Sequence, residues 1–197
     1  MLLERRDVNS NTPNIRCQSP LLIAAWKGHE GVAKMLLGRR DIDPNTADIS
    51  GQTPLIIAAR KGHEGVVNML LERRDVNSDT PDKYGQTPLS IATLEGHEGV
   101  VKMLLEQGDV SPNTAHNCGQ TPLFITAREG HEGAVKMLLE RWDANLNIAD
   151  KDDQTLLFIA AWKGYEGVAK MLLERRDVDP NTADKYGQTS LFIAAWK

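Results

Sequence analysis

A 34-residue pattern repeats along almost the whole chain of 197 residues. Its copies begin at Ser19, Thr53, Thr87, Thr121, Thr155 and Thr189. A fixed period between about 20 and 50 residues is typical of stacked supersecondary units, each of which buries its apolar face only against its neighbours. The period therefore predicts a repeat array whose function depends on a displayed surface.

The unit at residues 53–86 predicts a short first helix. Thr53 is suited to cap the helix, Pro54 favours its first turn, and Gly62 favours its end. Apolar residues and alanines fill the segment between them. Small alanines on one side would let a neighbouring helix approach closely.

The second half of the unit predicts another short helix and a long turn. Glu64 suits the positive end of this second helix, and Arg73 and Arg74 suit its last turn. Residues 75–86, rich in Asn, Asp, Pro and Gly, indicate an extended turn. Isolated helices shorter than about 12 residues are marginal in water, so stacking must hold them.

Composition and cysteine use exclude several classes of protein. The formal charge of -4 gives no global basic field for nucleic acid, and no apolar run is long enough for a membrane span. Cys17 and Cys118 lie in different loops without metal-binding spacing, so no disulfide framework is expected. The N-terminus lacks the apolar core of a signal peptide. These features predict a reducing, intracellular, cytoplasmic setting, with no nucleic-acid or membrane partner.

The motifs that resemble active or metal sites are all incomplete, so we expect neither catalysis nor a cofactor. Four His-Glu pairs imitate half of a zinc motif without its second histidine, so these histidines are interpreted as structural, bonding to the adjacent loop. Residues 177–184 begin like a calcium loop but lack its glycine and its glutamate. No catalytic constellation stands out from the repeated background.

Together these motifs resemble the ankyrin repeat. The resemblance rests on Thr53-Pro54-Leu55-x-x-Ala58-Ala59, Gly62-His63, Val66-Val67, Met69-Leu70-Leu71 and Gly85-Gln86-Thr87-Pro88, which recur in register. It implies an all-α solenoid of paired antiparallel helices with β-hairpin-like finger loops, and a concave side that binds another protein. The glycine that commonly ends the second helix is present only as Gly108. The near-identical units also resemble arrays of fungal multidomain sensor proteins.

We expect one ankyrin-repeat array over residues 1–197. Its parts are a half repeat (1–18), five full repeats (19–52, 53–86, 87–120, 121–154, 155–188) and a second half repeat (189–197). Apolar residues at both ends suggest a fragment of a larger sensor or adaptor protein, with end-to-end self-association as the alternative.

Two variable columns are the candidate binding site. The first lies at the end of the first helix and holds Trp26, Arg60, Leu94, Arg128, Trp162 and Trp196; the second lies at the finger tip and holds Ser50, Tyr84, Cys118, Asp152 and Tyr186, with Arg16 at the equivalent earlier position. The resemblance places both columns on the concave surface. Trp, Tyr and Arg are frequent interface anchors. The alternative for Trp26 and Trp162 is that they cover alanines of neighbouring helices.

Two other columns are interpreted as structural. The methionines Met35, Met69, Met103, Met137 and Met171 are expected in the core, and Phe124, Phe158 and Phe192 are expected to pack between repeats. The chain as a whole is thus predicted to be a non-catalytic scaffold for a protein partner. The rival hypothesis is a structural module that self-associates through uncapped apolar ends.

Overall fold

The computed structural model describes residues 11–141 and 145–196. The chain divides between Val110 and Ser111 into two compact units, which are described separately below. Every helix in the described ranges is short, with seven or eight residues. The predicted two-helix unit is therefore confirmed.

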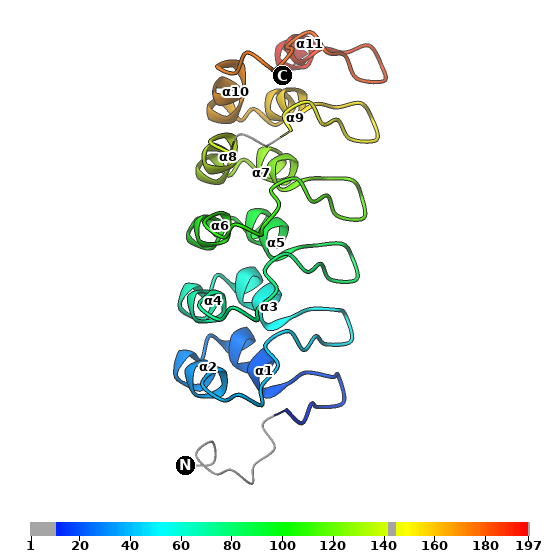
Figure 1. Ribbon diagram of the computed structural model, residues 1–197. Coiled ribbons are helices and arrows are strands. Elements are labelled where there is room, and N and C mark those ends of the chain that lie inside the picture. Colours follow the sequence, from blue (N-terminus) through cyan, green and yellow to red (C-terminus); the bar gives the residue numbers. More distant parts are fainter. Residues whose placement is uncertain (1–10, 142–144, 197) are drawn as a thin grey trace. The chain divides into compact units, whose positions relative to one another are not determined.

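Both units are built from alternating helices, which we call A and B helices (Figure 1). In the first unit the A helices are α1 (Pro20–Lys27), α3 (Pro54–Lys61) and α5 (Pro88–Glu95), and the B helices are α2 (Glu30–Leu37), α4 (Glu64–Leu71) and α6 (Glu98–Leu105). In the second unit the A helices are α7 (Pro122–Glu129), α9 (Leu156–Lys163) and α11 (Ser190–Trp196), and the B helices are α8 (Glu132–Leu139) and α10 (Glu166–Leu173).

Within each unit the A helices pack side by side, and the B helices form a second layer against them. Before each following A helix, the described loop residues project on the other side of the A layer (Figure 1). We call these loops fingers, and their tips are residues 48–52 and the equivalents in the other repeats. The fingers and the A helices thus border a common face of each unit.

Local capping explains where the A helices begin and end. Thr53 Oγ1 accepts a hydrogen bond from the main-chain nitrogen of Ile56 at 3.2 Å, and Pro54 follows as the first helical residue. Gly62 ends the helix in the left-handed region, with φ of 68°. A glycine suits this position because a side chain is strained at positive φ.

The core lies between the two helical layers. In the repeat at residues 53–86 it includes Leu55, Ala58 and Ala59 of α3 and Val67 and Leu70 of α4, all at most 1% exposed. Phe124 and Phe158 are also buried, as expected for packing between repeats, whereas Phe192 is exposed. Burial on this scale lets helices of eight residues persist.

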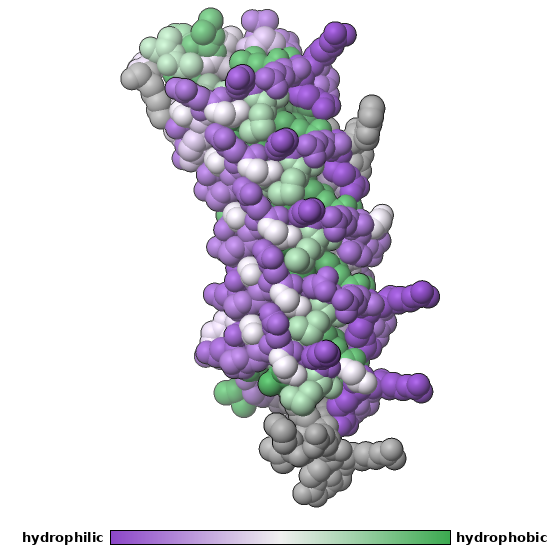
Figure 2. Space-filling model, turned by 90° about the vertical axis from the view of Figure 1, so that its left-hand side faces the viewer, coloured by the Kyte–Doolittle hydropathy of each residue, from purple (hydrophilic) through white to green (hydrophobic). Residues whose placement is uncertain are grey.

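The prediction that the methionine column lies in the core is wrong. Met35 is 38% exposed, and Met69, Met103, Met137 and Met171 are only partly buried. On each B helix the leucine that follows the methionine takes the inner position instead. Figure 2 shows the side formed by the B helices, where hydrophilic residues predominate and hydrophobic residues are visible between them.

The expected end of the second helix is also wrong. α4 ends at Leu71, so Arg73 and Arg74 lie beyond its last turn. The residue after the helix, Glu72, keeps a right-handed conformation with φ of -67°. Gly108 and the arginines Arg40, Arg74 and Arg176, which stand at the position of the typical glycine, do not adopt positive φ either, so no glycine is needed there.

Candidate functional site

Each finger tip is built around one acceptor side chain. Asp82 Oδ1 accepts main-chain hydrogen bonds from Tyr84 at 2.8 Å and Gln86 at 3.0 Å, which closes an Asx-type turn. Asp48, Asp150 and Asp184 make the same pair of bonds two and four residues on. His116 replaces the aspartate once, and its Nδ1 accepts from the nitrogen of Cys118 at 2.9 Å.

Main-chain bonds join successive fingers within a unit. The nitrogen of Ile49 donates to the oxygen of Arg16 at 3.3 Å, and that of Lys83 donates to the oxygen of Ser50 at 3.1 Å. In the second unit Lys185 donates to the oxygen of Asp152 at 3.1 Å. These contacts between fingers use main-chain atoms, so they do not depend on which side chains stand at Arg16, Ser50 and Asp152.

The finger column places its largest side chains in solvent. Tyr84, Tyr186 and Cys118 are exposed, and Ser50 and Asp152 are partly exposed. Lys185 Nζ lies 2.5 Å from Asp152 Oδ1 and 5.0 Å from the centre of the Tyr186 ring. The hydrogen bond with Asp152, and secondarily the one with Tyr186, raises the pKa of Lys185.

In the helix column, the tryptophans are half exposed. Trp26 and Trp162 each retain 44% exposure, and Trp196 is more exposed still. The ammonium of Lys27 lies 4.1 Å from the centre of the Trp26 ring, and that of Lys163 lies 5.3 Å from Trp162. These rings therefore present apolar surface together with a cation-accepting face.

The arginines of the same column are tied to the fingers. In the amide orientation that satisfies both groups, Gln52 Oε1 accepts from Arg60 Nη2 at 2.9 Å and from Nη1 at 3.2 Å. Arg60 Nη2 also lies 3.7 Å from Asp82 Oδ2, whose side chain is fully buried. Arg128 likewise donates from Nη1 to Gln120 Oε1 at 2.6 Å. Leu94 is partly buried at the equivalent position.

The glutamines and aspartates that receive these arginines did not emerge as candidates from the sequence. Both columns recur in every full repeat with little change, and constancy within an array is also what a purely structural residue shows. The sequence does contain one signal that marks the glutamines as partners of these arginines, namely a fixed spacing. Gln52 lies eight residues before Arg60, as Gln120 lies eight before Arg128.

A slot in the second unit gathers several of these groups. Trp162 of α9, Gln188 of the following finger, and Ile193 and Trp196 of α11 line a cavity of about 290 Å³. Asp184 of the same finger does not line the cavity, but its Oδ1 accepts a hydrogen bond from the main-chain nitrogen of Gln188 at 2.9 Å. Two tryptophans and a glutamine thus line the cavity, and the carboxylate of Asp184 belongs to the same finger as the glutamine.

The family profile described as "Ankyrin repeats (3 copies)" matches residues 21–115 and again residues 108–184. The chain belongs to the ankyrin repeat family. Ankyrin repeats generally act as protein–protein interaction modules and are generally non-catalytic scaffolds. This family match confirms the resemblance inferred from the motifs. No curated protein matches the chain.

The ankyrin histidines have a structural role, but their bonding partner differs from the expected one. His63 Nε2 lies 3.2 Å from the main-chain oxygen of Trp26, and His97 Nε2 lies 3.1 Å from that of Arg60. Each acceptor belongs to the last turn of the preceding A helix rather than to a loop. These histidines support the backbone directly under the variable helix column.

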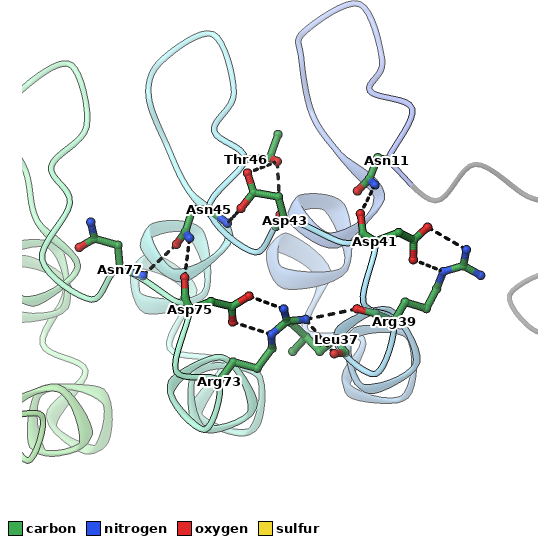
Figure 3. Close-up of polar contacts among 10 residues, drawn as sticks. All are labelled: Asn11, Leu37, Arg39, Asp41, Asp43, Asn45, Thr46, Arg73, Asp75 and Asn77. Atoms are coloured by element: carbon green, nitrogen blue, oxygen red, sulfur yellow. Dashed lines mark hydrogen bonds and ion pairs between the residues drawn. The ribbon is translucent and has the colours of Figure 1, made fainter.

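A second polar ladder joins neighbouring ankyrin repeats where the B helices end (Figure 3). Arg73 Nη1 donates to the oxygen of Leu37 at 2.9 Å, while its Nε and Nη2 pair with Asp75. Asn45 Nδ2 donates to the oxygen of Asp75 at 2.6 Å. Its Oδ1 accepts from the nitrogen of Asn77 at 2.8 Å.

The described residues contain no metal cluster and no membrane-spanning helix. Within residues 11–141 and 145–196, no three His, Cys, Asp or Glu side chains gather as a metal site would require. In the same residues no helix has the length and apolar character needed to cross a bilayer. Cys17 and Cys118 are both free thiols.

Proposed function

We propose that this chain is a non-catalytic scaffold that binds a protein partner through the face shared by its A helices and finger tips. The observation that supports it most directly is that the backbone and the side chains of the finger residues have different roles. Their backbone atoms link successive repeats, while Tyr84 and Tyr186 extend into solvent. A preformed backbone that carries exposed aromatic side chains lowers the ordering cost of binding.

The proposed binding residues are the two variable columns, and they differ in their expected contribution. Trp26, Trp162, Tyr84 and Tyr186 are the expected anchors because they are exposed. Arg60 and Arg128 are engaged with finger glutamines, so we expect them to shape the face more than to reach a partner. On this proposal the concave surface of the family corresponds to this face.

The wider context of the proposal comes from the sequence. The unbroken 34-residue period supports one array that includes both units. Membership of a larger sensor or adaptor protein, and a cytoplasmic setting, complete the proposal. Both rest on the resemblance to multidomain sensor arrays, and the free thiols of Cys17 and Cys118 are compatible with a reducing setting.

A four-site variant tests the proposal. Trp26, Tyr84, Trp162 and Tyr186 are replaced by alanine, and the matched control replaces Lys34, Lys102, Lys136 and Lys170, which are exposed on the B helices. A partner recovered with the wild-type protein is purified, and its affinity is measured by calorimetry. We expect at least a tenfold loss only in the aromatic variant, since a single anchor contributes about 2 kcal/mol or more.

Equal affinities of the wild-type protein and the aromatic variant for that partner would contradict the proposal, provided that circular dichroism shows an intact fold. Loss of affinity in the lysine control alone would place the binding face on the B helices.

Self-association remains the second candidate function because the second unit has an apolar hollow. Leu157, Ala161, Leu173, Leu191 and Ala194 are among the residues around a cavity of about 570 Å³ between α9, α10 and α11. Leu173 and Leu191 are exposed there. On this alternative a second copy covers the hollow. Sedimentation should then show dimers or larger species that Leu191→Glu disperses, and a monomer at high concentration would exclude it.

A further inference from the structure

We infer that the slot between Trp162 and Trp196 receives an arginine side chain of the protein partner. This inference rests on the proposed function and names the chemistry that one part of the binding face recognises. It is supported by the contents of the equivalent slots in other repeats and by an unpaired carboxylate oxygen beside this one.

The first support comes from repeat equivalence. Counting back four periods, Trp162, Gln188 and Trp196 correspond to Trp26, Gln52 and Arg60. At that earlier position Arg60 places its guanidinium on the Gln52 carboxamide oxygen. The protein's own architecture therefore accommodates a guanidinium against this glutamine, in a repeat that also carries the tryptophan.

A second internal example strengthens the argument. Arg128 Nη1 donates to Gln120 Oε1 at 2.6 Å in the second unit. In both cases an arginine on the A helix satisfies the finger glutamine. Where Trp196 replaces the arginine, the structure gives the side chain of Gln188 no hydrogen-bond partner among the described residues. An arginine supplied from outside would restore that pairing.

The carboxylate of Asp184 is the independent observation. The residue is only 6% exposed, its Oδ1 is used by the finger, and its buried Oδ2 has no hydrogen-bond partner among the described residues. A buried carboxylate oxygen left without a partner is costly. The equivalent Oδ2 of Asp82 also lacks a hydrogen-bond partner, but the guanidinium of Arg60, at the position of Trp162, lies 3.7 Å from it. A cation on this side of Asp184 would therefore offset its charge.

The two indole rings would provide apolar faces on which the guanidinium of the partner can stack. A guanidinium is planar and weakly hydrated, so it stacks well on tryptophan faces while its N–H groups donate to oxygen acceptors. The neighbouring cations are Lys163, which lies over Trp162, and Lys185, which is paired with Asp152. Lys27 lies over Trp26 while Arg60 pairs with Gln52, so a partner arginine need neither displace Lys163 nor break the Lys185 pair.

The experiment uses the whole chain and three small probes. Nα-acetyl-arginine amide is titrated, and the indole N–H signals are followed by NMR after assignment through Trp→Phe variants. Nα-acetyl-citrulline amide, an uncharged analogue of similar shape, and Nα-acetyl-lysine amide are the controls. We expect shifts at Trp162 and Trp196 with arginine, binding about fivefold weaker with citrulline, and a smaller response at Trp26 beside Arg60.

Two variants separate recognition from folding. Trp196→Arg copies the arrangement of Arg60 and Gln52, so it should fill the slot and abolish the response of Trp162. Asp184→Asn retains the Oδ1 acceptor of the finger turn but removes the charge, and it should erase the preference for arginine over citrulline. Unchanged dispersion of the remaining NMR signals shows that each variant is folded.

Equal binding of arginine and citrulline by the wild-type protein, or undiminished arginine binding by Trp196→Arg, would overturn the inference. So would the absence of any selective shift. If the aromatic four-site variant still loses its partner in that case, the binding face stands and only the arginine assignment fails.

Discussion

Arg73 donates a hydrogen bond from Nη1 to the main-chain oxygen of Leu37, 36 residues earlier, at 2.9 Å. The same guanidinium pairs with Asp75 through its other two nitrogens. One side chain thus joins the end of a B helix to the preceding repeat. Arg175 makes the equivalent bond to the oxygen of Leu139 at 3.1 Å in the second unit.

Replacing Arg73 should therefore weaken the first unit. Gln107 occupies the equivalent position in the next repeat, so Arg73→Gln introduces a residue that the array already tolerates. We expect a loss of about 1 to 2 kcal/mol in the free energy of unfolding, because charge-assisted hydrogen bonds are removed. Urea denaturation measures it. Arg74→Gln, at the exposed neighbouring residue, is the control, and an equal loss in both variants would refute the role of Arg73.

The pair with Arg73 also predicts a pH dependence. The hydrogen bond from Arg73, aided by its charge, lowers the pKa of Asp75 below the ordinary value. A carboxyl with a lowered folded-state pKa contributes stability above its unfolded-state pKa, and that contribution is lost as the pH falls through the folded-state pKa. In Arg73→Gln the Asp75 pKa should rise. Titration of the carboxyl carbon by NMR measures this shift, and an unchanged midpoint would contradict the pairing.

Gly62 combines two constraints that can be separated. Its φ is +68°, and a Cβ there would lie 2.7 Å from His97 Nδ1. Gly164 has a similar φ of +76° with nothing within 4 Å of a Cβ. Gly164→Ala should cost about 1 to 2 kcal/mol for the left-handed conformation alone. Gly62→Ala should cost more because the histidine ring must move as well.

Denaturation of the two glycine variants measures the difference. Adding His97→Ala should remove the extra cost in Gly62→Ala. Equal losses in both single variants would show that the histidine ring yields freely and does not constrain this site.

Asp153 is a strained position whose relief should stabilise the second unit. It adopts φ of 59° at the place where most fingers have glycine. Asp153→Gly should raise the thermal midpoint, since a left-handed residue with a side chain costs about 1 kcal/mol. Asp153→Ala keeps the strain and serves as the control. Calorimetry checks the order, and an alanine variant at least as stable as the glycine variant would refute it.

Much of this architecture is determined by short-range sequence. Thr53 bonds three residues ahead, Gly62 adopts positive φ, and Asp82 accepts from nitrogens two and four residues on. These interactions depend only on neighbouring residues, so the motif predicts them and the period repeats them. The exposed aromatic positions follow from the same register, whereas their use by a partner stays a prediction.

Only the tertiary structure decided which groups meet across repeats. The acceptor of His97, the outward placement of Met35 and the different surroundings of Asp82 and Asp184 all depend on contacts between segments more than 20 residues apart. Arg60 lies 3.7 Å from Asp82, whereas Trp162 is the equivalent residue for Asp184, so identical aspartates acquire different environments. The repeat period determines the position of each residue within its helix or finger, but packing in three dimensions determines what its side chain contacts.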